Sequence, residues 1–143
     1  MHMKVSIVVL TLLCALAAIS QTAKPSHKHQ VVFELNSPGA DAWNQMLNNI
    51  DNVKKAFAPD DVQIEVVALG KGLSILLKSN TAYEERLKKI ASEGVALSAC
   101  QNSMRLRKVV TEDLFPFAGQ VDSGAAEVVR KQEAGWSYLK SGE

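Results

Sequence analysis

Histidine and cysteine, two residues that often carry catalysis, are scarce in this sequence. Its three histidines are His2, His27 and His29. All lie near the N-terminus, so the folded part can build neither a Ser-His-Asp triad nor a Cys-His dyad unless this tail folds back. The two cysteines, Cys14 and Cys100, form no Cys-x-x-Cys pair, which excludes a thioredoxin-type dithiol cycle. Histidines in a tail seldom make a defined metal site, and we expect no metal.

A strong excess of charge of either sign is also lacking. The sequence has 16 lysines and arginines against 15 aspartates and glutamates. Nucleic-acid binding needs a basic face, and attraction to anionic lipid surfaces needs a basic cluster, so this balance argues against both kinds of partner. The segment Gly70-Lys71-Gly72 has neither the Rossmann nor the P-loop spacing. We therefore expect no cofactor.

One long hydrophobic run stands at the N-terminus. Val5–Ile19 is uncharged and almost wholly apolar, and it follows the basic segment Met1–Lys4. Its 15 residues are too few for a comfortable membrane span, which needs about 20, but they suit a signal peptide. Ala18 and Ser20 supply the small residues that precede a cleavage site. We predict a signal peptide over residues 1–20, cleaved after Ser20; the alternative is an uncleaved anchor.

Cleavage would leave a flexible leader over residues 21–29 and one domain over residues 30–143. The mature protein would be periplasmic or secreted, and it would have no membrane association. Cys14 would be lost with the signal, so Cys100 would be the single cysteine and could form no internal disulfide. Its thiol is then buried and inert, paired with another chain, or reactive.

Segments rich in β-branched residues alternate with segments of helical periodicity along the domain. Ser37-Pro38 predicts the start of the first long helix, and Thr81 with Glu84 predicts a capping box at the next one. Val109-Val110 predicts either an extension of the preceding short helix or a short edge strand. Strands are predicted over 31–35, 62–69, 95–99 and 120–122, and helices or helical turns over 37–58, 73–78, 81–93, 102–107, 111–115 and 123–139. This alternation predicts a three-layer α/β domain with a mostly parallel sheet covered on both faces.

Cys100 is the best candidate for chemistry. It falls at the carboxyl end of a predicted strand, where ligands gather in parallel α/β sheets. The backbone N–H groups of the next segment, together with Arg105, Arg107 and Lys108, would lower the pKa of the thiol and favour the reactive thiolate. The opposite interpretation is that Cys100 is a small buried hydrophobe. Position in the sequence does not decide between the two.

Several short motifs follow one another along the chain in an ordered series. They are Val31–Asn36 with Trp43-Asn44, Val66–Gly70, Ala99–Met104, and Ser123–Glu127 through Gln132, Gly135-Trp136 and Tyr138. Together they resemble the DsrE/DsrF-like family over nearly the whole mature chain. The resemblance implies a flavodoxin-like three-layer fold and assembly into homo-trimers or homo-hexamers.

The resemblance also implies a function. In the sulfur-relay members of this family, a strand-end cysteine accepts sulfane sulfur and passes it on as a persulfide, and Cys100 matches that position. Asn102 would orient the sulfur, Gly70 and Gly72 would shape the facing loop, and Arg105 would attract an anionic donor such as thiosulfate. The partners would be a sulfur donor and an acceptor thiol protein, and the activity would be at most that of a sulfurtransferase-like carrier. The alternative functions are a non-enzymatic oligomeric binding module with a structural Cys100, or a redox-sensing thiol.

Overall fold

The computed structural model describes residues 29–142. The predicted signal peptide, and the predicted leader except for its last residue, lie outside this range. Within it, all strand pairs are parallel and form one five-stranded sheet in the order β4-β3-β2-β1-β5. The strands are β1 (His29–Leu35), β2 (Val62–Ala68), β3 (Ala96–Cys100), β4 (Gly119–Val121) and β5 (Ser137–Ser141). The predicted parallel α/β class is confirmed.

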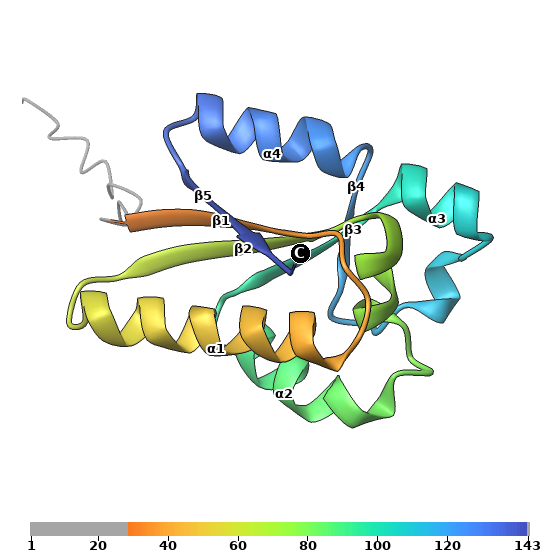
Figure 1. Ribbon diagram of the computed structural model, residues 1–143, viewed down its shortest axis with the longest axis horizontal. Coiled ribbons are helices and arrows are strands. Elements are labelled where there is room, and N and C mark those ends of the chain that lie inside the picture. Colours follow the sequence, from red (N-terminus) through yellow and green to blue (C-terminus); the bar gives the residue numbers. More distant parts are fainter. Residues whose placement is uncertain (1–28, 143) are drawn as a thin grey trace, which may run out of the picture.

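Helices connect the strands and cover both faces of the sheet (Figure 1). They are α1 (Ala40–Phe57), the 3-10 helix η1 (Gly70–Leu76), α2 (Thr81–Ser92), α3 (Gln101–Arg107), the 3-10 helix η2 (Thr111–Asp113) and α4 (Gly124–Glu133). α1 and α2 lie on one face, and α4 lies on the other. In the part of the chain that the structure describes, none of these helices combines the length and hydropathy needed to cross a bilayer.

The direction of the chain explains why α4 lies on its own face. β1 to β4 are added in one direction along the sheet, and β5 then returns to pair with the free edge of β1. Crossovers between parallel strands are right-handed, so a reversal of direction places the connecting helix on the opposite face. The fold is therefore a three-layer, flavodoxin-like domain, as the sequence predicts.

The same reversal places a topological switch point at the carboxyl ends of β3 and β4. The connection after β3 keeps to the side of α1 and α2, because Met104 of α3 joins the core of that face. The connection after β4 leads to α4 on the other face. Ligands of open α/β sheets bind where neighbouring strands send their connections to opposite faces. Cys100, the last residue of β3, lies at this point.

The two faces of the sheet differ in how apolar they are. Beneath α1 and α2, the core is extensive and includes Phe33, Leu47 and Ile64. Beneath α4, the buried apolar cluster is small: Val32, Val67 and Val128, with Leu69, Val121 and Trp136 against them. Polar groups occupy the remaining buried positions of this second face, and they matter for the site.

The predicted final helix is wrong in its second half. A stripe that includes Val128, Gln132, Trp136 and Leu139 has helical spacing, yet α4 ends at Glu133 and Ser137 begins β5. Gly135 ends the helix in the left-handed region at φ 88. Its N–H donates to the Gln132 carbonyl and the Trp136 N–H donates to the Lys131 carbonyl, the Schellman pattern. The last segment then completes the sheet beside β1.

Two predicted helix starts are also corrected. The first helix begins at Ala40, after Gly39 at φ 93, and not at Ser37-Pro38. At α2 the N-cap residue is Asn80, Thr81 is already helical, and no side chain caps the end. Val109-Val110 forms neither helix nor strand.

Candidate functional site

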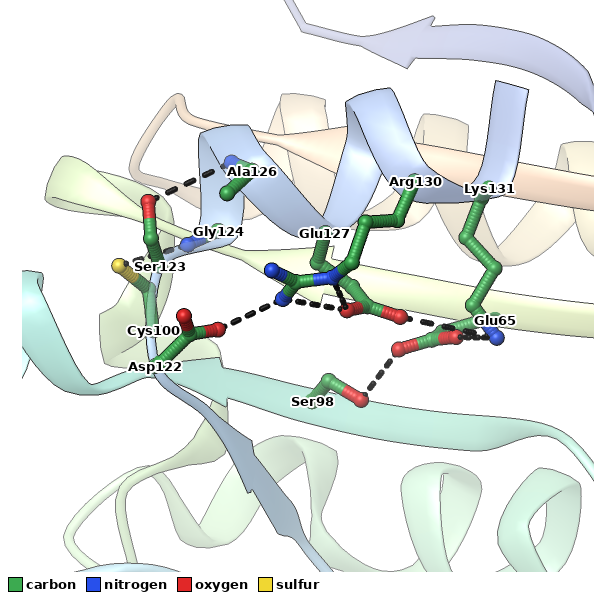
Figure 2. Close-up of polar contacts among 10 residues, drawn as sticks. All are labelled: Glu65, Ser98, Cys100, Asp122, Ser123, Gly124, Ala126, Glu127, Arg130 and Lys131. Carbon is green, nitrogen blue, oxygen red and sulfur yellow. Dashed lines mark hydrogen bonds and ion pairs between the residues drawn. The ribbon is translucent and has the colours of Figure 1, made fainter. Parts of the chain in front are cut away.

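The Cys100 sulfur lies where the N-terminal ends of two helices meet. Cys100 ends β3 and is itself the N-cap residue of α3. Its Sγ accepts hydrogen bonds from the backbone N–H of Ser103 at 3.4 Å and from the backbone N–H of Gly124 at 3.1 Å. Figure 2 shows the second contact, which joins β3 to the first residue of α4. Exposed helix N–H groups favour negative charge, so this arrangement stabilises a thiolate.

Gly124 allows α4 to approach the sulfur this closely. A Cβ built on Gly124 would lie 2.9 Å from Leu69 Cβ, 3.1 Å from Cys100 Cβ and 3.2 Å from Val67 Cγ1. Any side chain would therefore push the start of α4 away from the sheet. The neighbouring Ser123 fixes the helix start from the other side, because its Oγ accepts the Ala126 N–H at 3.3 Å.

Ser103 connects the sulfur to the loop after β2. Its backbone N–H donates to Cys100 Sγ, and its hydroxyl oxygen accepts the Gly70 N–H at 2.7 Å. Gly70 has φ 55, a left-handed conformation that glycine adopts without strain. The predicted proximity of the Gly70 loop to Cys100 is therefore observed, and Ser103 is the link between them. Sequence reasoning missed this role.

Hydrogen bonds lower the pKa of the Cys100 thiol. Burial has the largest single effect and raises the pKa. Hydrogen bonds from the Ser103 side chain and from the backbone N–H groups of Gly124, Ser103 and Asn102 act in the opposite direction. Together they outweigh burial, so the pKa lies below its ordinary value of 9.0. The predicted lowering by N–H groups agrees with this geometry, and hydrogen bonds, not the charge of the nearby arginines, lower this pKa.

Cys100 is nonetheless buried, with 3% of its surface exposed. A cysteine that serves only as a small hydrophobe is surrounded by apolar groups, and its pKa is raised. Here backbone amides surround the sulfur and its pKa is lowered. The geometry favours the thiolate interpretation, provided that a reagent can reach the sulfur.

The side chains of the predicted substrate-binding residues do not all point towards the Cys100 sulfur. The Asn102 side chain is turned towards Arg105, whose Nη2 donates to Asn102 Oδ1, and the backbone N–H of Asn102 acts on the sulfur. Arg105 also lines a surface groove of about 330 Å³ that includes Gln101 and Gln120. Arg107 is exposed at the end of α3. The arginines therefore lie at the rim of the site, outside direct contact with Sγ.

Position 72 requires glycine for a steric reason. A Cβ at this position would lie 2.1 Å from the Leu35 carbonyl oxygen and 3.0 Å from the Asn36 backbone nitrogen. The residue lets η1 cross the end of β1 at backbone contact distance. Gly72 is buried, and its part in a loop that faces Cys100 stays a prediction.

A buried polar network beneath α4 escaped the sequence reasoning. The Glu65 carboxylate accepts a hydrogen bond from Ser98 Oγ at 2.6 Å and pairs with Lys131 Nζ at 2.6 Å. At the surface, Arg130 pairs with Asp122 at 2.6 Å, just before α4 begins, and Figure 2 shows these contacts together. One available signal was the single carboxylate within the mostly apolar sequence of β2. Its partner could not be read from the sequence.

The fold and the site define a class of protein. It is a parallel α/β domain in which one cysteine at the carboxyl edge of the sheet accepts hydrogen bonds from backbone amides. The sequence model of the DsrE/DsrF-like family matches residues 10–141, and the chain belongs to this family. MTH1491 from Methanobacterium thermoautotrophicum, a protein of unknown function, superimposes with a TM-score of 0.74 and 28% identity. The ychN protein from E. coli gives a TM-score of 0.62 at 12% identity, which shows the fold alone. Each match covers 78% of this chain and 98% of the other. No curated protein matches the sequence significantly.

Proposed function

We propose that this protein is an exported sulfur carrier in which the Cys100 thiolate accepts sulfane sulfur and passes it on as a persulfide. The observation that carries the proposal is the pair of backbone N–H groups, from Ser103 and Gly124, on the Cys100 sulfur. They supply stabilisation for negative charge at the one cysteine of the folded domain. Membership of a family that includes sulfur-relay proteins supports the same chemistry.

The reaction needs no cofactor. The Cys100 thiolate attacks the outer sulfur of a donor such as thiosulfate, and a new S–S bond forms. The S–S bond of the donor breaks, and its electron pair leaves with sulfite. An acceptor thiolate then attacks the outer sulfur of the Cys100 persulfide and carries it away, which regenerates the Cys100 thiolate. A thiolate is the attacking species in both steps, so a lowered pKa at Cys100 favours the first step and makes Cys100 a better leaving group in the second.

The surroundings of Cys100 give each neighbour a role in this proposal. Arg105 attracts the anionic donor to the surface groove that it lines. The Asn102 N–H, with the amides already on Sγ, stabilises the charge of the persulfide. Gly70 holds the facing loop through Ser103. Because only 3% of the Cys100 residue is exposed, transfer requires that the start of α4, which contacts the sulfur through Gly124, moves aside transiently.

Export and assembly are part of the proposal. The apolar run at residues 5–19 supports a signal peptide, which places the carrier in the periplasm or outside the cell. We propose that it works there as a homo-trimer or homo-hexamer with a separate donor and an acceptor thiol protein. The mature chain then carries a single thiol, so an oxidising compartment cannot form an internal disulfide.

Intact-mass measurement after incubation with thiosulfate or polysulfide tests the function. The wild-type protein is expected to gain the mass of one sulfur atom, and Cys100→Ala is expected to gain none. A native thiol that takes up no sulfur and resists alkylation until the chain is unfolded supports the binding-module alternative. Sulfenic acid or mixed disulfide under peroxide, without sulfur uptake, supports a redox-sensing thiol.

A further inference from the structure

Glu65 is a buried carboxylate that lies far from Cys100 in the sequence. It is 4% exposed, and it lies on β2 beneath α4. Both of its oxygens are satisfied: Ser98 Oγ donates to one and Lys131 Nζ pairs with the other, each at 2.6 Å. The ammonium of Lys131 also lies 4.2 Å from the centre of the Trp136 ring. Buried ion pairs add little net stability, but their geometry is demanding, which suggests that this pair determines position.

The network continues from Glu65 to the start of α4. Lys131 lies 3.7 Å from Glu127, and Glu127 pairs with Arg130 at 2.8 Å. Arg130 in turn pairs with Asp122 at 2.6 Å. Asp122 lies two residues before Gly124, whose N–H reaches Cys100 Sγ (Figure 2). The chain of contacts thus runs from the middle of the sheet to the sulfur.

Apolar packing alone specifies the position of α4 weakly. Gly124 and Val128 are its buried residues, and Val128 packs with Val32 and Val67 in a small cluster. Val129, on the same helix, is exposed. Small apolar contacts tolerate shifts that directional contacts do not. The ion pair is therefore a directional contact between α4 and the sheet, in addition to the hydrogen bond from Gly124 to Cys100.

We propose that Glu65 and Lys131 are positioning residues for Cys100: the pair between the buried Glu65 and the partly buried Lys131 fixes α4 on the sheet and so holds the Gly124 N–H on the Cys100 sulfur. Neither residue touches the reacting sulfur. This inference rests on the proposed function only for its effect on sulfur transfer, since the placement of Gly124 is a separate property of the fold.

The test compares variants of the full folded protein by two measurements. The first is the midpoint of the pH profile for alkylation of Cys100 by iodoacetamide. The second is the hydrogen exchange of the Gly124 amide. Lys131→Met and the nearly isosteric Glu65→Gln are expected to raise the midpoint by roughly one pH unit, the equivalent of one hydrogen bond to a charged group. Both are expected to speed exchange at Gly124 at least about tenfold. Lys131→Arg, which can keep the ion pair, is expected to restore both values.

Lys54→Met is the matched control. Lys54 of α1 pairs with Glu93 at the C-terminal end of α2. The distance is 2.6 Å, as in the pair of Lys131 and Glu65. This change is expected to leave both readouts at the wild-type values. The proposal is overturned if folded Glu65→Gln keeps the wild-type midpoint and Gly124 exchange, or if Lys54→Met shifts them equally. A wild-type protein that takes up no sulfur would refute the proposed function, whereas the two readouts would still decide this inference.

Discussion

Replacing Gly124 with alanine perturbs the proposed thiolate site through one methyl group. The added Cβ would lie 2.9 Å from Leu69 Cβ and 3.1 Å from Cys100 Cβ, so the start of α4 must move away. The 3.1 Å hydrogen bond from the Gly124 N–H to Cys100 Sγ is then lost or lengthened. A hydrogen bond to a charged group contributes about 1.5–3 kcal/mol, and one pKa unit corresponds to about 1.4 kcal/mol. We therefore expect the pKa of Cys100 to rise by about one to two units.

The assay is the rate of iodoacetamide alkylation of native protein as a function of pH. Gly119→Ala is the control, because the nearest atom to its added Cβ, the Leu97 carbonyl oxygen, is 3.7 Å away, an ordinary contact. The control is expected to keep the wild-type midpoint. If a folded Gly124→Ala protein titrates like wild type, the Gly124 amide does not stabilise the thiolate and the reasoning fails.

Four further predictions concern the same region and its neighbours. Ser103→Ala removes the acceptor of the Gly70 N–H and is expected to lower the free energy of unfolding in urea by about 1–3 kcal/mol. The same change is expected to raise the pKa of Cys100, and Ser103→Thr is expected to restore it. Equal urea midpoints and equal alkylation midpoints in wild type and both variants would contradict this. Gly72→Ala forces a backbone clash and is expected to prevent folding or to cost more than about 3 kcal/mol; a soluble variant with the wild-type melting temperature would refute it. Because the folded pKa of Cys100 is lowered, its thiolate stabilises the fold above the ordinary value of 9.0 and loses this contribution as pH falls through the folded pKa. The unfolding free energy of wild type relative to Cys100→Ser should accordingly rise with pH across that window, and a flat difference would count against a lowered pKa. The hydrogen bond to Glu34 and burial raise the pKa of Tyr138 to about 12; Glu34→Gln should lower it in an ultraviolet titration of tyrosinate, and an unchanged value would show that the bond to Glu34 is not the cause.

Much of the fold could be predicted because local signals agreed with the tertiary structure. β-branched segments marked β1, β2 and β3, and Gly94 ended α2 at φ 92 as predicted. The placement of Cys100 at the end of β3 followed from the same segments. These features depend on short stretches of sequence, and the burial of both sheet faces reinforces them.

The errors arose where long-range contacts decide the outcome. The segment after Gly135 has a helical stripe, yet Gly135 ends α4 and the segment pairs with β1 as a strand. The contact of Gly124 with Cys100 depends on the reversal of strand order, which no local pattern contains. The pair of Glu65 and Lys131 likewise exists only once α4 crosses over β2. The basic residues near Cys100 in sequence predicted that positive charge lowers the pKa of its thiol. In the folded site, hydrogen bonds lower this pKa.

The most direct test of the central claim is the pH dependence of sulfur uptake by native Cys100. Wild-type protein would be mixed with a sulfane donor, quenched by alkylation at short times, and analysed by peptide mass mapping. We expect persulfide on Cys100, formed at a rate whose pH profile has its midpoint below the ordinary thiol pKa of 9.0. It would be contradicted if the native protein formed no persulfide at any pH while the unfolded chain did.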